Sequence, residues 1–186
     1  MQAEIDWKPM EMNKEFIIPF AGLKLGKHQF RYQISNSFFE LFNYEEFNSS
    51  KIDVTADLEK TSTIMELTLK AEGSVNVNCD LSREPYDQPL SGELDLVIKF
   101  GDEYDDDYED IVVLPHSEHQ LDISHFIYEM IVLAVPQKRI HPGVIDGSLK
   151  SELLDKLRDL DPSGSNDQEK RNDPRWDALK KLLTNK

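Results

Sequence analysis

Apolar and polar residues alternate along most of the stretch from residue 52 to residue 100. The alternation comes in four runs, separated by short stretches rich in turn-forming residues. A period of two is typical of strands with one buried and one solvated face, so the sequence predicts a four-stranded antiparallel meander. The apolar positions are Ile52, Val54, Ala56 and Leu58; Met65, Leu67, Leu69 and Ala71; Val75, Val77 and Cys79; and Leu94, Leu96, Ile98 and Phe100.

The last two runs are predicted to pair, with a loop of about seven to nine residues between them that contains Pro85 and Pro89. Cys79 lies at the edge of this loop and on the apolar-facing side of its strand. A buried structural thiol is therefore favoured over a nucleophile at this position.

Residues outside the meander add further strands and several helices. Residues 15–20, 28–34 and 111–114 are predicted strands, and residues 36–44 a short helix. Apolar residues recur with helical spacing from 123 to 135, after a cap at Asp122 and before the helix-stopping Pro136. A second helix is predicted around Leu149, Leu153, Leu157 and Leu160.

The predicted fold class is α+β: an antiparallel sheet of about six or seven strands, one face covered by the helix at 123–135, with C-terminal helices packed at an edge. Residues 1–160 are expected to form a single domain. Residues 161–172 are expected to form a polar linker. Residues 173–186 are expected to form a last helix, capped by Asp173, started by Pro174 and carrying Trp176.

The formal net charge of −15 is the strongest compositional constraint. It argues against tight, non-specific binding of nucleic acid through a broad basic surface, because such affinity comes mainly from Lys and Arg. It permits a basic protein partner, or a local basic patch on an acidic body. There is no membrane-spanning apolar run and no signal-peptide pattern, so a cytoplasmic protein is expected.

Residues 102–110 hold seven acidic residues in nine positions. The tract lacks the glycine and terminal glutamate that an EF-hand calcium loop needs. Self-repulsion favours a solvated, mobile loop. A mimic of nucleic-acid phosphates and a docking segment for a basic protein remain open.

The sequence contains no recognisable catalytic constellation. It has no glycine-rich phosphate loop and no nucleophile elbow, and its five histidines are scattered without ligand spacing. A single cysteine can form neither an internal disulfide nor a multi-thiolate zinc site. We therefore expect no enzyme activity, no cofactor, no metal and no small-molecule substrate.

A compact basic segment follows the helix at 123–135, with Lys138, Arg139 and His141 close together. These side chains complement a helix dipole or form a binding patch, and both interpretations stay open. Together with Arg175 they are the candidates for contact with RNA or a protein partner.

Four segments in this order resemble the YceD family of large ribosomal RNA subunit accumulation proteins. They are the stretch from Cys79 to Tyr86, the stretch from Ile127 to Pro136, the Lys138–Pro142 segment and the stretch from Asp173 to Leu182. The residues that carry the resemblance are Cys79, Asp80, Ser82, Pro85, Tyr128, Glu129, Pro136, Asp173, Pro174, Arg175 and Trp176.

The resemblance implies a cytosolic, non-enzymatic factor for synthesis, processing or accumulation of 23S ribosomal RNA, and hence for large-subunit assembly. Many family members have a second cysteine where Ser82 stands and further cysteines where residues 143–157 have none, so no zinc site carries over. The partner is expected to be ribosomal RNA, contacted directly or indirectly, or a basic ribosomal or processing protein. An acidic adaptor without a ribosomal role is the alternative.

One substitution test follows from the sequence. Reversing the charges of Lys138 and Arg139 together is expected to impair large-subunit assembly and to leave the fold intact.

Overall fold

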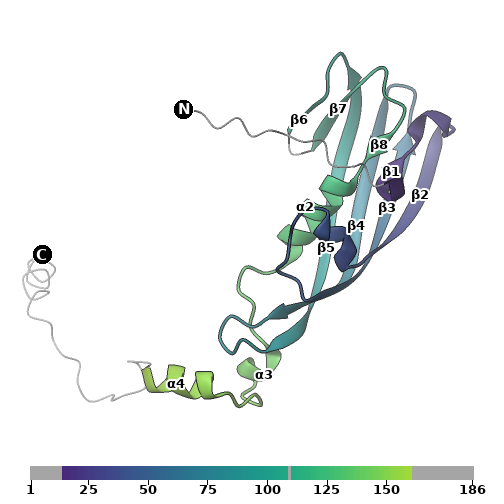
Figure 1. Ribbon diagram of the computed structural model, residues 1–186. Coiled ribbons are helices and arrows are strands. Elements are labelled where there is room, and N and C mark those ends of the chain that lie inside the picture. The colour runs from purple at the N-terminus through teal and green to yellow at the C-terminus, as the bar shows by residue number, and fades with distance from the viewer. Residues whose placement is uncertain (1–13, 109, 161–186) are drawn as a thin grey trace, which may run out of the picture. The chain divides into compact units, whose positions relative to one another are not determined.

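The computed structural model describes residues 14–108 and 110–160, and one large sheet dominates them (Figure 1). In this described part the sheet has six strands, in the order β2-β3-β4-β5-β7-β6, and β1 and β8 form a separate antiparallel pair. All neighbours in the large sheet are antiparallel except β5 and β7. The strands are β1 (Ile17–Ile18), β2 (Gly26–Ile34), β3 (Ser49–Lys60), β4 (Ile64–Asn78), β5 (Pro85–Gly101), β6 (Asp105–Tyr108), β7 (Ile111–Pro115) and β8 (Leu121–Asp122).

The alternating stretch forms three long strands, so the prediction of four was wrong. The runs that end at Ala71 and begin at Val75 belong to the single strand β4, which passes through Gly73 without a break. Gly73 lies opposite Ile52 of β3. A Cβ atom at Gly73 would collide with the carbonyl oxygen of Lys51 and would lie 2.7 Å from the Cα atom of Ile52. The glycine therefore permits close approach of two strands and does not end one.

Pro85 and Pro89 lie inside β5 and not in the loop where the sequence placed them. They pair with Asn78 and Ser74 of β4. The parallel neighbour β7 pairs with β5 only from Val97 onward, so this part of β5 is an edge on its other side. A proline without an N–H donor is tolerated at such an edge.

The acidic tract contains a short edge strand where a loop was expected. β6 pairs with β7 through Asp105 and Tyr108, with an irregularity between these two positions. A four-residue edge strand with charged residues resists pairing with other chains. Self-repulsion of the carboxylates therefore does not prevent strand pairing in this tract.

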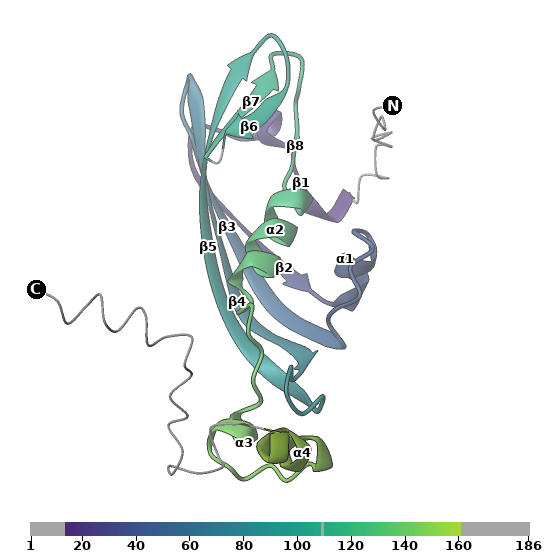
Figure 2. The same cartoon turned by 90° about the vertical axis from the view of Figure 1, so that its left-hand side faces the viewer.

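The helix α2 (Ser124–Ala134) covers one face of the sheet, as predicted (Figure 2). Its apolar stripe, which includes Phe126, Ile127, Met130 and Ile131, is buried. Asp122 accepts hydrogen bonds from the backbone N–H and the hydroxyl of Ser124, at 2.9 and 2.6 Å. The N-cap residue is Ile123, which makes no side-chain cap hydrogen bond, so the predicted cap at Asp122 was wrong by one position.

A glycine on β5 lets α2 approach the sheet closely. The Cγ atom of Met130 and the Cβ atom of Ala134 lie 3.1 and 3.3 Å from the position that a Cβ atom would take at Gly92. A larger residue at Gly92 would push the helix away from the sheet.

The segment before β2 is mostly helical turns, so the strand predicted at 15–20 was largely wrong. Two short 3-10 helices, Lys14–Phe16 and Phe20–Gly22, flank β1. Pro19 has no N–H with which to extend a ladder. Phe16, Ile18 and Phe20 are nevertheless buried, so the apolar alternation at these positions marks the core correctly. The short helix α1 (Asn36–Glu40) occupies the first part of the helix predicted at 36–44.

Contacts among backbone atoms divide the chain into two units, residues 1–141 and 142–186. In the second unit the structure describes α3 (Pro142–Ile145) and α4 (Glu152–Leu160). Leu149 lies before α4, and Leu153, Leu157 and Leu160 of the predicted stripe are exposed, whereas Leu154 is buried. The predicted linker at 161–172 and the predicted last helix at 173–186 lie outside the described residues. The described elements confirm the α+β fold class.

Candidate functional site

A tight turn joins β4 to β5 at the end of the sheet that carries the predicted motif residues. The backbone N–H of Cys79 donates to the carbonyl of Glu84, and the N–H of Arg83 donates to the carbonyl of Cys79, both at 2.9 Å. Arg83 adopts a left-handed conformation with φ of 64°, which lets the chain reverse. Ser82 is buried in this turn, and its hydroxyl accepts a hydrogen bond from the N–H of Glu84 at 3.4 Å.

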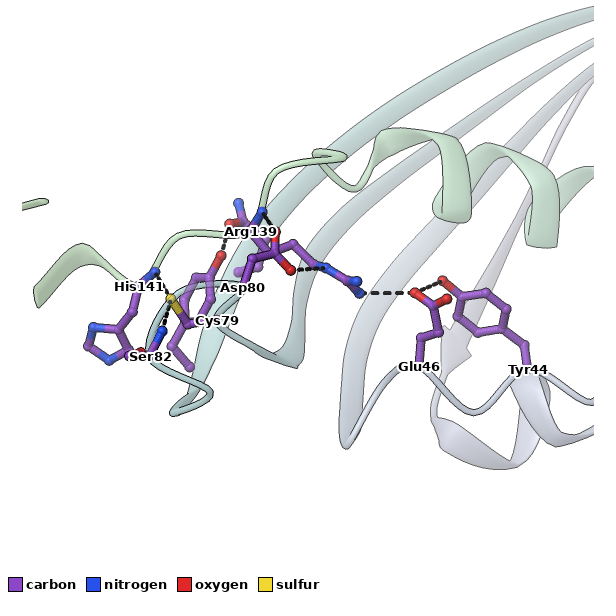
Figure 3. Close-up of polar contacts among 9 residues, drawn as sticks. Tyr44, Glu46, Cys79, Asp80, Ser82, Arg139 and His141 are labelled. Atoms are coloured by element: carbon purple, nitrogen blue, oxygen red, sulfur yellow. Dashed lines mark hydrogen bonds and ion pairs between the residues drawn. The ribbon is translucent and has the colours of Figure 1, made fainter. Parts of the chain in front are cut away.

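The basic segment after α2 is fixed to this turn by reciprocal hydrogen bonds (Figure 3). The N–H of Asp80 donates to the carbonyl of Arg139, and the N–H of Arg139 donates to the Oδ2 atom of Asp80, both at 2.8 Å. The basic segment therefore lies against the end of the sheet and hydrogen-bonds to the β4–β5 turn, although the two are far apart in the sequence. We call Glu46, Cys79, Asp80, Arg139 and His141 the sheet-end cluster.

The Cys79 thiol is a buried hydrogen-bond acceptor in this cluster. Its side chain is fully buried, and its sulfur accepts hydrogen bonds from the N–H groups of His141 at 3.2 Å and Ser82 at 3.5 Å. Burial alone raises the pKa of the thiol, but hydrogen bonds from the N–H of His141, the hydroxyl and N–H of Ser82 and the N–H of Leu81 together outweigh it, and the net pKa lies below the ordinary value. Burial of Cys79 confirms its predicted placement, and its bonds give it a positioning role that the sequence did not reveal.

The Arg139 side chain is engaged by carboxylates and is not free for phosphate. Its guanidinium donates to the Oε2 atom of Glu46 at 3.0 Å and lies 3.8 Å from the Oδ1 atom of Asp80. Only 25% of the side chain is exposed. A phosphate group would have to displace both carboxylates, so Arg139 acts first as a structural cation.

The remaining candidate cations do not form one patch in the described part of the chain. Lys138 is exposed and has no hydrogen-bond or ion-pair partner among the described residues. The ring of His141 packs edge-on against Tyr86, with ring centres 5.3 Å apart. Arg175 lies outside the described residues, as do Asp173, Pro174 and Trp176. The structure therefore brings Arg139 and His141 to the sheet end and leaves Lys138 as a single exposed charge.

Of the three remaining motif residues in the described part, Tyr128 is half-buried, whereas Glu129 and Pro136 are exposed. Tyr128 of α2 stacks on Phe42, with ring centres 4.2 Å apart and an angle of 7° between the rings. The Oε1 atom of Glu129 lies 3.0 Å from the Nε2 atom of His125, one turn away on α2. Pro136 is exposed just after the helix and ends it.

Sequence reasoning missed Glu46 and Tyr44. The hydroxyl of Tyr44 donates to the Oε2 atom of Glu46 at 3.4 Å, and the same oxygen accepts from Arg139 (Figure 3). Glu46 is one acid among thirty-six acidic residues, so its pairing across 93 positions leaves no local signal in the sequence.

Tyr44 gives this region a testable pH dependence. Burial, followed by the charge of Glu46, raises the pKa of Tyr44 to about 12, while Arg139 acts in the opposite direction. The unfolded chain releases this proton near pH 10, as an unperturbed phenol does. Between about pH 10 and 12 the folded protein thus holds a proton that the unfolded chain has lost, and stability falls as pH rises.

We expect Tyr44→Phe to remove one titrating group near pH 12 from the phenolate absorbance of the folded protein. The variant should also lose less stability than the wild type over the same pH range. If the absorbance lost in the variant titrates near pH 10, as an unperturbed phenol does, the buried placement of Tyr44 is contradicted.

A second feature of the described surface lies away from the sheet end. A cavity of about 500 Å³ is lined by Lys27, Gln29, Asp57, Glu59 and other residues of β2, β3 and β4. Lys27 pairs with Glu59 at 3.5 Å, and Gln29 donates to Asp57 at 2.8 Å. These polar groups satisfy one another across the strands and do not converge on a reactive centre.

The described residues contain neither a cluster of metal-binding side chains nor a membrane-spanning helix. Among them, no group of three or more His, Cys, Asp and Glu side chains is arranged to hold a metal ion. None of the described helices is both long and apolar enough to span a membrane.

Comparison with known proteins identifies the family. The model of the family described as large ribosomal RNA subunit accumulation protein YceD matches residues 67–183. No curated protein and no solved structure matches the chain. The matched region is more than half of the sequence and contains the β4–β5 turn, α2 and the basic segment, in agreement with the resemblance of the four motifs. The chain therefore belongs to the YceD family of large ribosomal RNA subunit accumulation proteins.

Proposed function

We propose that this protein is a non-enzymatic factor for the synthesis, processing or accumulation of 23S ribosomal RNA, and thereby for assembly of the large ribosomal subunit. The observation that carries the proposal is the family match over residues 67–183, because the family's description names accumulation of the large ribosomal RNA. That description names no reaction. The proposed site of action is the cytoplasm, where ribosomal RNA would be met.

We further propose that contact with RNA is indirect and that a basic ribosomal or processing protein is the partner. The net charge of −15 opposes binding to a polyanion. The ion pairs of Arg139 with Glu46 and Asp80 support the same choice, since they neutralise the most central cation of the candidate patch. Lys138 alone provides at most one phosphate contact.

Sedimentation of ribosomal particles from depleted cells tests the proposed function. Depletion should produce an excess of free small subunits and a deficit of large subunits, because small-subunit assembly does not need the large-subunit RNA. Wild-type protein supplied from a plasmid should restore the profile. A normal profile after complete depletion would contradict the proposal.

A further inference from the structure

Three aromatic side chains form a half-buried platform between α2 and the loop after α1. Phe42 and Tyr128 are stacked face to face, and Tyr44 meets Tyr128 edge-on with ring centres 5.8 Å apart. Phe39 and Phe47 pack beneath Tyr44, with ring centres 6.1 and 4.9 Å away, and both are buried. The platform, defined as Phe42, Tyr44 and Tyr128, is therefore held in place by the core.

Acidic residues flank this platform along the chain. Glu40 precedes Phe42 by two positions, Glu45 and Glu46 follow Tyr44, and Glu129 follows Tyr128. All four are exposed, and the segment from Asn36 to Phe47 contains no Lys or Arg. Glu40 and Glu45 have no ion-pair or side-chain hydrogen-bond partner among the described residues. Two carboxylates beside the platform are thus available to a cation.

The same region already holds one guanidinium group of the protein itself. Arg139 donates to Glu46, and Glu46 also accepts from the hydroxyl of Tyr44 (Figure 3). The arrangement shows that a flat cation fits between carboxylates next to these aromatic rings. Guanidinium groups stack on aromatic faces and pair with carboxylates in a planar fork, which an ammonium group cannot do.

We propose that the platform and its flanking acids bind an arginine-rich segment of a protein partner. This inference rests on the proposed function, since it gives the chemistry of the basic partner and the surface that meets it. Charge complementarity selects this occupant, because carboxylates repel the phosphates that would accompany bases of RNA stacked on the same rings. The half-exposed rings supply the preference for arginine over lysine, because a guanidinium group stacks on aromatic rings.

Binding of an arginine–glycine repeat peptide to the full-length protein tests the proposal, with a lysine–glycine peptide of equal length beside it. The surface variant is Glu40→Gln with Glu45→Gln. The control variant is Asp53→Asn with Glu72→Gln, an exposed cross-strand pair on β3 and β4 that removes the same charge. At about 0.15 M salt, the surface variant should weaken arginine-peptide binding about fivefold, and the control less than twofold.

The wild type should also prefer the arginine peptide over the lysine peptide, and Tyr44→Leu should reduce that preference. Thermal unfolding of each variant checks that the fold is retained. Equal weakening by the surface and control variants would overturn the proposal, because it would indicate general attraction to an acidic protein. Absence of peptide binding would overturn it, as would binding of single-stranded RNA that the surface variant abolishes.

The two proposals fail in different ways. If depletion removes large subunits while the peptide does not bind the platform, the partner surface is wrong and the function stands. If the peptide binds the platform while ribosome profiles stay normal after depletion, the function is wrong and the surface stands.

Discussion

Replacement of Gly73 by alanine is expected to lower the free energy of unfolding by about 3 kcal/mol. The added Cβ atom would collide with the carbonyl oxygen of Lys51 and would lie 2.7 Å from the Cα atom of Ile52. Both atoms belong to the backbone of the neighbouring strand, so no side-chain rotation can relieve the overlap. β3 and β4 would have to move apart at the centre of the sheet.

Urea or thermal denaturation measures this loss, with a decrease in melting temperature of roughly 6–12 °C for a chain of this size. Gly22→Ala is the matched control, because no atom lies within 4 Å of the position that its Cβ atom would take. The control should stay within about 0.5 kcal/mol of the wild type. Equal stability of the Gly73 and Gly22 variants would show that β3 and β4 do not approach as closely as described.

Charge reversal at Arg139 is expected to destabilise the protein by about 2 kcal/mol, whereas charge reversal at Lys138 should change stability by less than about 0.5 kcal/mol. Arg139→Glu removes two ion pairs and places a third carboxylate beside Asp80 and Glu46. Lys138→Glu alters an exposed side chain with no ion-pair partner among the described residues.

Denaturation of the two single variants separates a structural role from a binding role. The double charge reversal suggested by the sequence does not test a binding patch cleanly. Arg139 supports the packing of the basic segment, so the double variant would lose stability as well as any binding. Adding Glu46→Arg to Arg139→Glu should recover part of the lost stability through a swapped pair. Equal stability of both single variants would argue against the ion pairs at the sheet end.

The apolar alternation predicted the core of the sheet and the face on which α2 packs. It could not show where a strand ends. Glycine and proline are typical of turns, and whether a strand can run through Gly73 or Pro89 depends on which other strands lie beside them. Gly73 is required by the close approach of β3, and Pro89 is permitted because β7 pairs with β5 only farther along. Both facts depend on strands that are distant in sequence.

The candidate site was predictable in part. The motif around Cys79 could be singled out by its family resemblance and the basic segment near Arg139 by its residue types, and the structure brings these two segments together. The sequence did not reveal that Glu46 neutralises Arg139, because an ion pair between residues 93 positions apart leaves no periodic pattern. The leucines of α4 show the same limit, since Leu154 is buried while the predicted stripe residues Leu153, Leu157 and Leu160 are exposed.

The ratio of 23S to 16S ribosomal RNA in cells depleted of this protein is the decisive measurement for the proposed role in accumulation of the large ribosomal RNA. The ratio should fall after depletion and return when wild-type protein is supplied. An unchanged ratio, with the protein shown to be absent, would contradict this role.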